Sequence, residues 1–451
     1  MRRAEQAVLG AAGAVAAGTL VVGLAVEASG RVLGTATPPF IGALGPAARI
    51  LPTLAAAAFL AAIVAAGPRL LRAPRSPAAF AVAVFLLALG AALLVNAARS
   101  GTSGWSAVFD TGPGGSFEAK NEYLPGLPAL SYGTGFFLDR FAELVPALPV
   151  NVAGHPPGLL LLIDALGIRT PGALAALCIA CAAAVAPLTY AIGRALDLDG
   201  SFPTTPRPRA RLRGTPHLGE ERARVAALLA VGSPALLLFG TTSADAVYAA
   251  AGAGAAALLV ARRNAWRAAG CVALAFATLG SWVLLAIGAW AVIVAMRRDG
   301  LRAAVLLGGG CAVAVVALDG TLAAAAGYDP IGTLRATERV YRTSLAEVRP
   351  YAFWVVGSPV AFAVTLGLPV AGAVLVAALR RQTAALAILA VVVIASVAGF
   401  TKAETERIWL PFVPLACVAA AGVIPAGRLR LVLGALAVQA LGTQLLFFTV
   451  W

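Results

Sequence analysis

Long apolar runs recur along this 451-residue chain, and short polar stretches separate them. Most runs are about 17 to 25 residues long, the length that an α-helix needs to cross a bilayer. They lack the alternating segments of about ten residues that form membrane β-barrels. We therefore predict an all-α polytopic membrane protein with about thirteen transmembrane helices, within a range of eleven to fourteen. The predicted spans lie near 6–26, 48–67, 77–97, 171–193, 224–241, 243–261, 268–280, 282–296, 303–323, 351–378, 383–400, 408–425 and 431–451.

The composition supports this class. Charged residues make up only 12% of the chain, about half the share in a soluble protein of ordinary composition. Frequent Ala and Gly favour close helix packing in lipid. All five cysteines fall inside apolar runs and indicate small buried side chains. Cys178 and Cys181 have zinc-like spacing, but no second pair accompanies them, so we assign no metal to them.

The net charge of +14 is unevenly distributed. With the N-terminus inside, the arginine-rich connections at 69–75, 194–224, 262–267, 297–302, 380–381 and 427–430 all fall on the inner side. This is the positive-inside pattern of a membrane protein, so the basic balance does not indicate nucleic acid. The opening MRRAEQ runs into apolar sequence without a clear cleavage site and indicates a retained first helix. We expect a multi-pass plasma (inner) membrane protein with a cytoplasmic N-terminus.

Three parts of the chain are expected: an N-terminal helix pair at 1–76, a transmembrane core at 77–425 and a C-terminal helix at 426–451. The core carries a long outer loop at 99–158. Two further outer segments lie at about 327–350 and 401–407. A loop of this length with its own pattern of aromatics and prolines is typical of a functional segment.

The first outer loop carries the most candidate chemistry. Asp110 and Glu122 are its two candidates for function, whereas Asp139 and Glu143 are expected to be solvated charges on a short interfacial helix, LDRFAELV at 138–145. His155 stands before two prolines, which restrict its backbone to extended conformations. It either caps the next helix or takes part in the site.

The second outer segment, TLRATERVYRTSLAEV at 333–348, has a basic pattern. If it is helical, Arg335, Arg339 and Arg342 share one face. Guanidinium groups present a planar fork to phosphate oxygens, so this face is a candidate for binding a lipid phosphate. General attachment to lipid headgroups and ion pairs with Glu338 and Glu347 are the alternatives.

The third outer segment, FTKAETERIWLPFVP, places Lys402, Glu404 and Arg407 between two apolar helices. Charges in this position are costly when they face lipid, so we expect them to face the bundle interior or a water-filled cavity. Arg407 is the preferred phosphate contact. Asp245 lies at an outer helix turn, where it serves either the site or a helix-terminal hydrogen bond.

In their order along the chain, these residues resemble the GT-C superfamily of polyprenyl-phosphate-sugar glycosyltransferases, especially protein O-mannosyltransferases (glycosyltransferase family 39) and lipid A aminoarabinose transferases. The features are an acid in the first large outer loop, HPPG at 155–158, the helix pair at 224–250 and KAETERIWLPFVP at 402–414. They span most of 77–425. The family's adjacent acidic pair is absent, because Asp110 is followed by Thr-Gly-Pro and Glu122 is preceded by Asn121.

The resemblance implies a GT-C-like fold and an inverting single displacement on the extracytoplasmic face. The donor would be mannose, arabinose or a similar sugar on a polyprenyl phosphate, and the acceptor a lipid, polysaccharide or protein of the cell envelope. Asp110 would be the first choice for the catalytic base and Glu122 the second. His155 would orient the loop, contact phosphate, or share a divalent cation with a carboxylate, and no other cofactor is expected. A transporter or lipid flippase and a non-catalytic scaffold descended from such transferases are the competing hypotheses.

Overall fold

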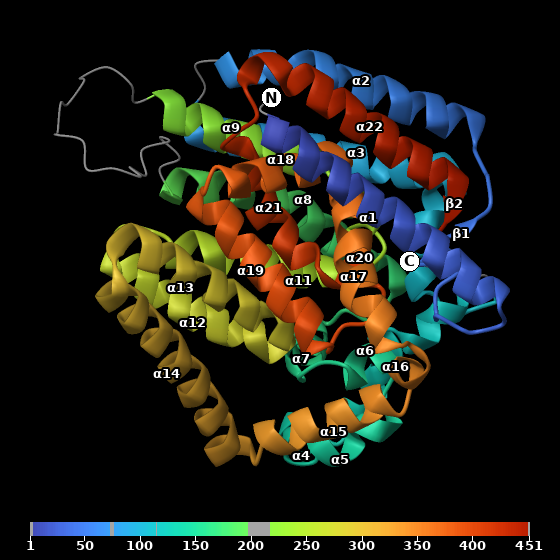
Figure 1. The fold of residues 1–451 in the computed structure, drawn as a ribbon. Helices are drawn as coiled ribbons and strands as arrows, with labels where there is room; N and C mark the ends of the chain where they lie inside the picture. Colours follow the sequence, from blue (N-terminus) through green and yellow to red (C-terminus); the bar gives the residue numbers. More distant parts are fainter. Residues whose placement is uncertain (1–2, 73–75, 114, 197–216, 450–451) are drawn as a thin grey trace.

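The computed structural model describes residues 3–72, 76–113, 115–196 and 217–449, and nearly all of its regular structure is helical (Figure 1). The first part comprises α1 (Arg3–Ala28), β1 (Ala43–Leu44), α2 (Ile50–Arg72) and α3 (Pro77–Ser100). Short helices then fill the long loop: η1 (Thr102–Trp105), η2 (Ala107–Phe109), η3 (Phe117–Asn121), η4 (Leu124–Leu130), α4 (Thr134–Asp139), α5 (Phe141–Leu144), η5 (Val145–Ala147), α6 (Val150–Ala153) and α7 (Gly158–Ala165).

The middle of the chain holds the centre of the bundle. Its elements are α8 (Pro171–Leu196), α9 (His217–Gly232), α10 (Pro234–Leu238), α11 (Asp245–Leu259), α12 (Asn264–Gly280), η6 (Trp282–Leu284), α13 (Leu285–Asp299) and α14 (Leu301–Ala326). Helix α8 packs against α3, α9 and α11, and α21 packs against α8 and α9. The predicted break after Gly280 is confirmed, because α12 ends there.

The last part comprises α15 (Pro330–Arg342), α16 (Leu345–Val348), α17 (Tyr351–Leu366), α18 (Leu368–Leu379), α19 (Thr383–Ala398), α20 (Thr405–Ile408), η7 (Leu410–Phe412), α21 (Val413–Ala421), η8 (Ala426–Arg428), α22 (Leu429–Leu446) and β2 (Phe447–Phe448). Helix α22 lies beside α2 (Figure 1). The antiparallel pair β1–β2 joins the segment after α1 to the end of α22.

The helices identify a membrane protein, but the predicted number of spans is not confirmed. Within the described ranges, six helices are long and apolar enough to cross a bilayer: α1, α2, α3, α8, α14 and η8–α22. The pair α17 and α18 makes a seventh if it counts as one broken span. Shorter apolar helices lie at Asp245–Leu259, Thr383–Ala398 and Leu410–Ala421. The GT-C arrangement is likewise not confirmed.

The predicted span at 351–378 is wrong as a continuous helix. Its two halves, α17 and α18, meet at Gly367 with a bend of 114°. Gly367 has φ +109°, a backbone region that side chains with a Cβ disfavour. A Cβ at this position would also lie 2.2 Å from a methyl carbon of Leu436. Hydropathy alone therefore overestimated the length of this helix.

Side chains from two other helices satisfy the backbone at this bend. Gln439 of α22 accepts a hydrogen bond from the Leu368 amide at 2.9 Å and donates one to the Val364 carbonyl. Ser233 donates to the Leu366 carbonyl at 3.2 Å. Ser233 itself separates α9 from α10, so the predicted span at 224–241 is also interrupted. The two interruptions lie against each other.

Candidate functional site

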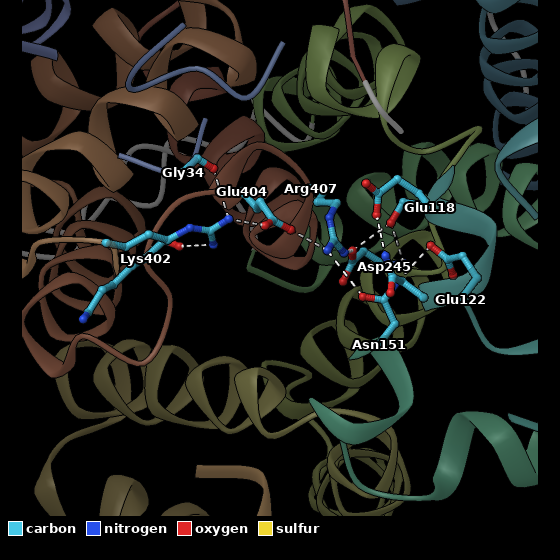
Figure 2. Close-up of polar contacts among 11 residues, drawn as sticks. Gly34, Glu118, Glu122, Asn151, Asp245, Lys402, Glu404 and Arg407 are labelled. Carbon is cyan, nitrogen blue, oxygen red and sulfur yellow. Dashed lines mark hydrogen bonds and ion pairs between the residues drawn. The ribbon is translucent and has the colours of Figure 1, made fainter. Parts of the chain in front are cut away.

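Buried polar side chains from three distant parts of the chain meet at one place. Glu122 and Asn151 come from the long loop, Asp245 from the first residue of α11, and Glu404 and Arg407 from the segment around α20 (Figure 2). We call these five residues the polar cluster. All belong to connections or helix starts, so the bundle holds them at its end instead of in the middle of a span.

Arg407 joins these segments. Its guanidinium lies 2.7 Å from Asp245 Oδ2 and 2.6 Å from Glu404 Oε2. Only 8% of its side chain is exposed. Removing one member of such a buried ion pair typically costs about 3–5 kcal/mol, because a charge remains without its counterion. The cluster is therefore a structural element as well as a candidate site.

The backbone before Arg407 is strained. Ala403 and Glu404 have φ values of 65° and 57°, both in the left-handed region that non-glycine residues rarely adopt. Such strain costs on the order of 1–3 kcal/mol per residue and persists only where surrounding contacts enforce it. Here Ala403 is fully buried against Leu33 and Trp354, and the Glu404 carboxylate is bound by two arginines. Strain of this kind is concentrated at functional sites in proteins.

A second arginine extends the cluster on the Glu404 side. Arg349, two residues before the start of α17, lies 2.7 Å from Glu404 Oε1. It also donates to the carbonyls of Lys402 and Gly34 (Figure 2). Gly34 has φ +78°, and a Cβ there would lie 2.8 Å from Arg349 Nε. The segment after α1 is thus tied to the same network.

Asn151 connects Arg407 to Glu122. Its amide nitrogen donates to Glu122 Oε1 at 2.9 Å, while its amide oxygen accepts from Arg407 at 3.5 Å. Glu122 is 0% exposed, and its second oxygen, Oε2, has no hydrogen-bond partner among the described residues. Nearly all buried polar atoms in proteins are paired. An unpaired carboxylate oxygen at the end of an ordered network is an acceptor available for a substrate proton.

His155 borders the cluster through aromatic neighbours. Its ring packs on Tyr248 with centroids 5.1 Å apart, and the Tyr248 hydroxyl is hydrogen-bonded to that of Tyr123 at 2.5 Å. His155 does not cap α7, because the helix has no side-chain cap. Close packing explains why the HPPG motif ends in a glycine, Gly158. A Cβ there would lie 2.5 Å from the Leu279 carbonyl oxygen, so only glycine lets α7 approach α12 this closely.

Burial and neighbouring charges shift the acid–base properties of these loop residues. Burial raises the pKa of Glu122 to about 8, against the opposing charge of Arg407 and the hydrogen bond from Asn151. Burial also raises the pKa of Glu406 to about 7. Burial, with the charge of Arg407, lowers the pKa of His155 to about 4 despite Asp245. At neutral pH, Glu122 is therefore mostly protonated and His155 is neutral.

The charges of the cluster are balanced when the neighbouring Arg349 is counted with them. Burial alone would raise the pKa of Glu404, but Arg407 and Arg349 hold it below its ordinary value. Burial alone would lower the pKa of Arg407, but the charges of Glu404 and Asp245 hold it above its ordinary value. Two guanidinium groups thus face two carboxylates, and a protonated Glu122 adds no charge. Loss of the Glu122 proton would leave the cluster and Arg349 together with one net negative charge.

The structure brings some predicted site residues together and leaves others apart. Glu122, Asp245, Glu404 and Arg407 belong to the cluster, and His155 borders it. The Lys402 carbonyl accepts from Arg349, and its side-chain ammonium donates to the Ala346 carbonyl at 3.0 Å, away from the cluster (Figure 2). Asp110 lies at the end of η2, where its carboxylate accepts from the Gly112 amide. The other three, Arg335, Arg339 and Arg342, lie on the exposed side of α15.

Sequence reasoning missed Asn151, Arg349, Tyr123 and Tyr248. Arg349 had a usable signal in the sequence. It precedes a proline and an apolar run, Pro350 onward, in the same way as Arg407 precedes Leu410-Pro411. Asn151 had none, since a single amide in a loop is common. Within the described ranges, no three His, Cys, Asp or Glu side chains are grouped closely enough to hold a metal ion. The donors around Glu122 are arginine and amide groups, which bind anions and carboxylates.

Comparison with known proteins gives no relative: no family model, curated protein or solved structure matches this chain.

Proposed function

We propose that this chain is a membrane glycosyltransferase of the GT-C type. It moves a sugar such as mannose or arabinose from a polyprenyl phosphate to a hydroxyl of a cell-envelope acceptor on the extracytoplasmic face. The observation that supports this most is the Glu122 carboxylate, which Asn151 holds by one oxygen while the other has no partner among the described residues. That is the arrangement that a general base requires.

In the proposed reaction, the acceptor oxygen attacks C1 of the sugar as the C1–phosphate oxygen bond breaks. The hydroxyl proton passes to Glu122, and polyprenyl phosphate leaves with the bonding electrons. A single displacement of this kind inverts the configuration at C1. Arg407 acts through Asn151 to orient Glu122 and contributes positive potential toward the departing phosphate. His155, neutral and at the edge of the cluster, donates a hydrogen bond to the phosphate.

An apolar cavity provides room for the lipid part of the donor. It has a volume of about 500 Å³ and lies between α1, α17, α18 and α19. Phe362 lines it and packs on Trp409, with ring centroids 5.5 Å apart. Trp409 follows Arg407 by two residues, so this wall of the cavity adjoins the segment that carries Arg407. Its apolar walls suit an isoprenoid chain.

The test compares purified wild type with Glu122→Gln and Asp110→Asn in detergent. Each is incubated with radiolabelled polyprenyl-phospho-mannose, arabinose and glucose, and released polyprenyl phosphate is measured. Loss of a general base lowers rates by about 10²–10⁴-fold, so we expect that loss for Glu122→Gln and near-normal turnover for Asp110→Asn. The wild-type rate should rise with pH through about 8, as Glu122 loses its proton.

Two results would count against this proposal. If wild type consumes none of the donors, the transferase function fails. If Asp110→Asn is inactive while Glu122→Gln turns over normally, transfer stands but the base is Asp110.

A transporter or flippase is the second candidate, and the broken helices favour it. Discontinuous helices that meet inside the membrane form the binding sites of many transporters. Here α17–α18 and α9–α10 are interrupted at adjoining positions. Transport of a fluorescent lipid across reconstituted vesicles, without donor cleavage, would support this function over transfer.

A further inference from the structure

Helix α15 presents two different faces. Thr333, Ala336 and Thr337 are buried, and they pack toward α5 and η5 of the long loop. The opposite face exposes two apolar side chains, Ile331 at 57% and Leu334 at 47%. Three arginines share that exposed face: Arg335, Arg339 and Arg342.

The arginines differ in their partners. Arg342 lies 2.6 Å from Glu338, one turn earlier on the same helix. The guanidinium groups of Arg335 and Arg339 have no hydrogen bond or ion pair among the described residues. An isolated basic side chain on a surface is ordinary, but two of them interleaved with exposed Ile and Leu form the pattern of a helix that lies in a membrane interface.

The position of α15 along the chain indicates what covers this face. Helix α14 is long and apolar enough to span a bilayer, and it ends at Ala326. Helix α15 begins only four residues later, at Pro330, so it starts near the membrane surface. Asp329 caps its first turn by accepting from the Gly332 amide, which fixes the direction in which α15 leaves α14. Figure 1 shows α15 leaving the end of α14 and running beside α5.

We propose that this face of α15 binds the anionic headgroups of bilayer phospholipids, with Arg335 and Arg339 contacting phosphate and Ile331 and Leu334 entering the acyl boundary. The binding site is separate from the polar cluster and does not depend on the proposed transfer reaction. The proposed binding site lies on one side of α15, and the other side of α15 supports two segments next to the polar cluster. Thr337 donates to the Ala153 carbonyl at 2.9 Å, and the Tyr341 hydroxyl accepts from the Lys402 amide at 2.9 Å.

Amide hydrogen exchange of the full chain in nanodiscs tests this directly. We expect residues 331–342 to exchange more slowly in nanodiscs that contain phosphatidylglycerol than in pure phosphatidylcholine. Each basic residue near an anionic surface contributes roughly fivefold to binding, so Arg335→Gln/Arg339→Gln should weaken binding to phosphatidylglycerol roughly 30-fold and lose the extra protection. Arg335→Lys/Arg339→Lys should keep the protection, because headgroup attraction depends on charge.

The matched control is Arg263→Gln/Arg302→Gln, which removes two exposed arginines at the starts of α12 and α14. It should leave exchange at 331–342 unchanged. Equal exchange in both lipids, or full protection in the double glutamine variant, would overturn the proposal. So would protection that appears only when polyprenyl phosphate is added to phosphatidylcholine nanodiscs, because α15 would then bind the donor and not the bilayer.

Discussion

The polar cluster and the helix break at Gly367 both place polar groups inside an apolar helical protein. At the break, uncharged groups of Gln439 and Ser233 pair with the backbone of residues 364–368. At the cluster, full charges are brought together and Glu122 Oε2 has no partner among the described residues. A complete network of neutral hydrogen bonds stabilises a fold, whereas a charged network with one open acceptor is suited to chemistry.

The largest effect is expected when Arg407 is replaced. Arg407→Gln leaves Asp245 and Glu404 buried with one fewer counterion, which should destabilise the protein by about 3–5 kcal/mol. Thermal unfolding in detergent measures this loss. The double variant Asp245→Asn/Arg407→Gln should recover part of it, because one unpaired charge is gone. If both variants unfold at the wild-type temperature, the cluster does not contribute to stability.

The next largest loss of stability is expected when Gly367, the glycine at the break, is replaced. Gly367→Ala imposes a positive φ on a residue with a Cβ and moves that Cβ against Leu436. Backbone strain of this kind costs on the order of 1–3 kcal/mol. Gly427→Ala is a suitable control, since no atom lies within 4 Å of its Cβ position. Equal melting temperatures for Gly367→Ala and the control would mean that the bend is not a fixed feature.

A smaller loss is expected when the side chain that bridges the break is removed. Gln439→Leu leaves the Leu368 amide without its acceptor, while Val364 keeps the hydrogen bond from the Gly367 amide. Leu368 is itself exposed on the outside of the helices, so we expect the loss of one ordinary hydrogen bond, about 0.5–1.5 kcal/mol. Gln439→Glu keeps an acceptor for the Leu368 amide but removes the donor to the Val364 carbonyl. Comparing the two variants therefore separates the contributions of the two hydrogen bonds.

Sequence reasoning predicted these two regions unequally. Charges in an apolar chain are few, so Glu122, His155, Asp245, Glu404 and Arg407 could be selected without a structure. Their pairing could not be predicted, because Arg407 and Asp245 are 162 positions apart and no local pattern joins them. The choice between Asp110 and Glu122 depends on burial, which a loop sequence does not reveal.

The fold was predicted at the level of class and not of helix continuity. Apolar length identifies a membrane helix, but it does not register a backbone turn inside an apolar run. The sequence Gly367-Leu368-Pro369 was a signal for a bend, since glycine permits positive φ and proline favours a helix start. Ser233-Pro234 is a similar signal between α9 and α10. Hydropathy runs across both, which is why the predicted spans there were too long.

The smallest change in stability and the largest in activity should come from Glu122→Gln. The pKa of Glu122 rises from an ordinary value of 4.5 to about 8 on folding, so the folded state holds this proton more tightly than the unfolded state. Its contribution to stability is therefore complete below about pH 4.5 and is lost as the pH rises through about 8. Gln has nearly the same shape and no acidic proton to lose. The free energy of unfolding of the variant should therefore lie within roughly 1 kcal/mol of wild type at pH 5.

Melting temperatures from pH 5 to pH 8.5 decide this prediction. Wild type should lose stability across that range, with a contribution from Glu406, whose pKa burial raises to about 7. Glu122→Gln should lose less, so its stability relative to wild type should improve as the pH rises, while Glu406→Gln isolates the second carboxyl. If Glu122→Gln and wild type lose stability in parallel, Glu122 does not hold its proton on folding. The cluster would then resemble the break, as a structural network whose charges are already satisfied.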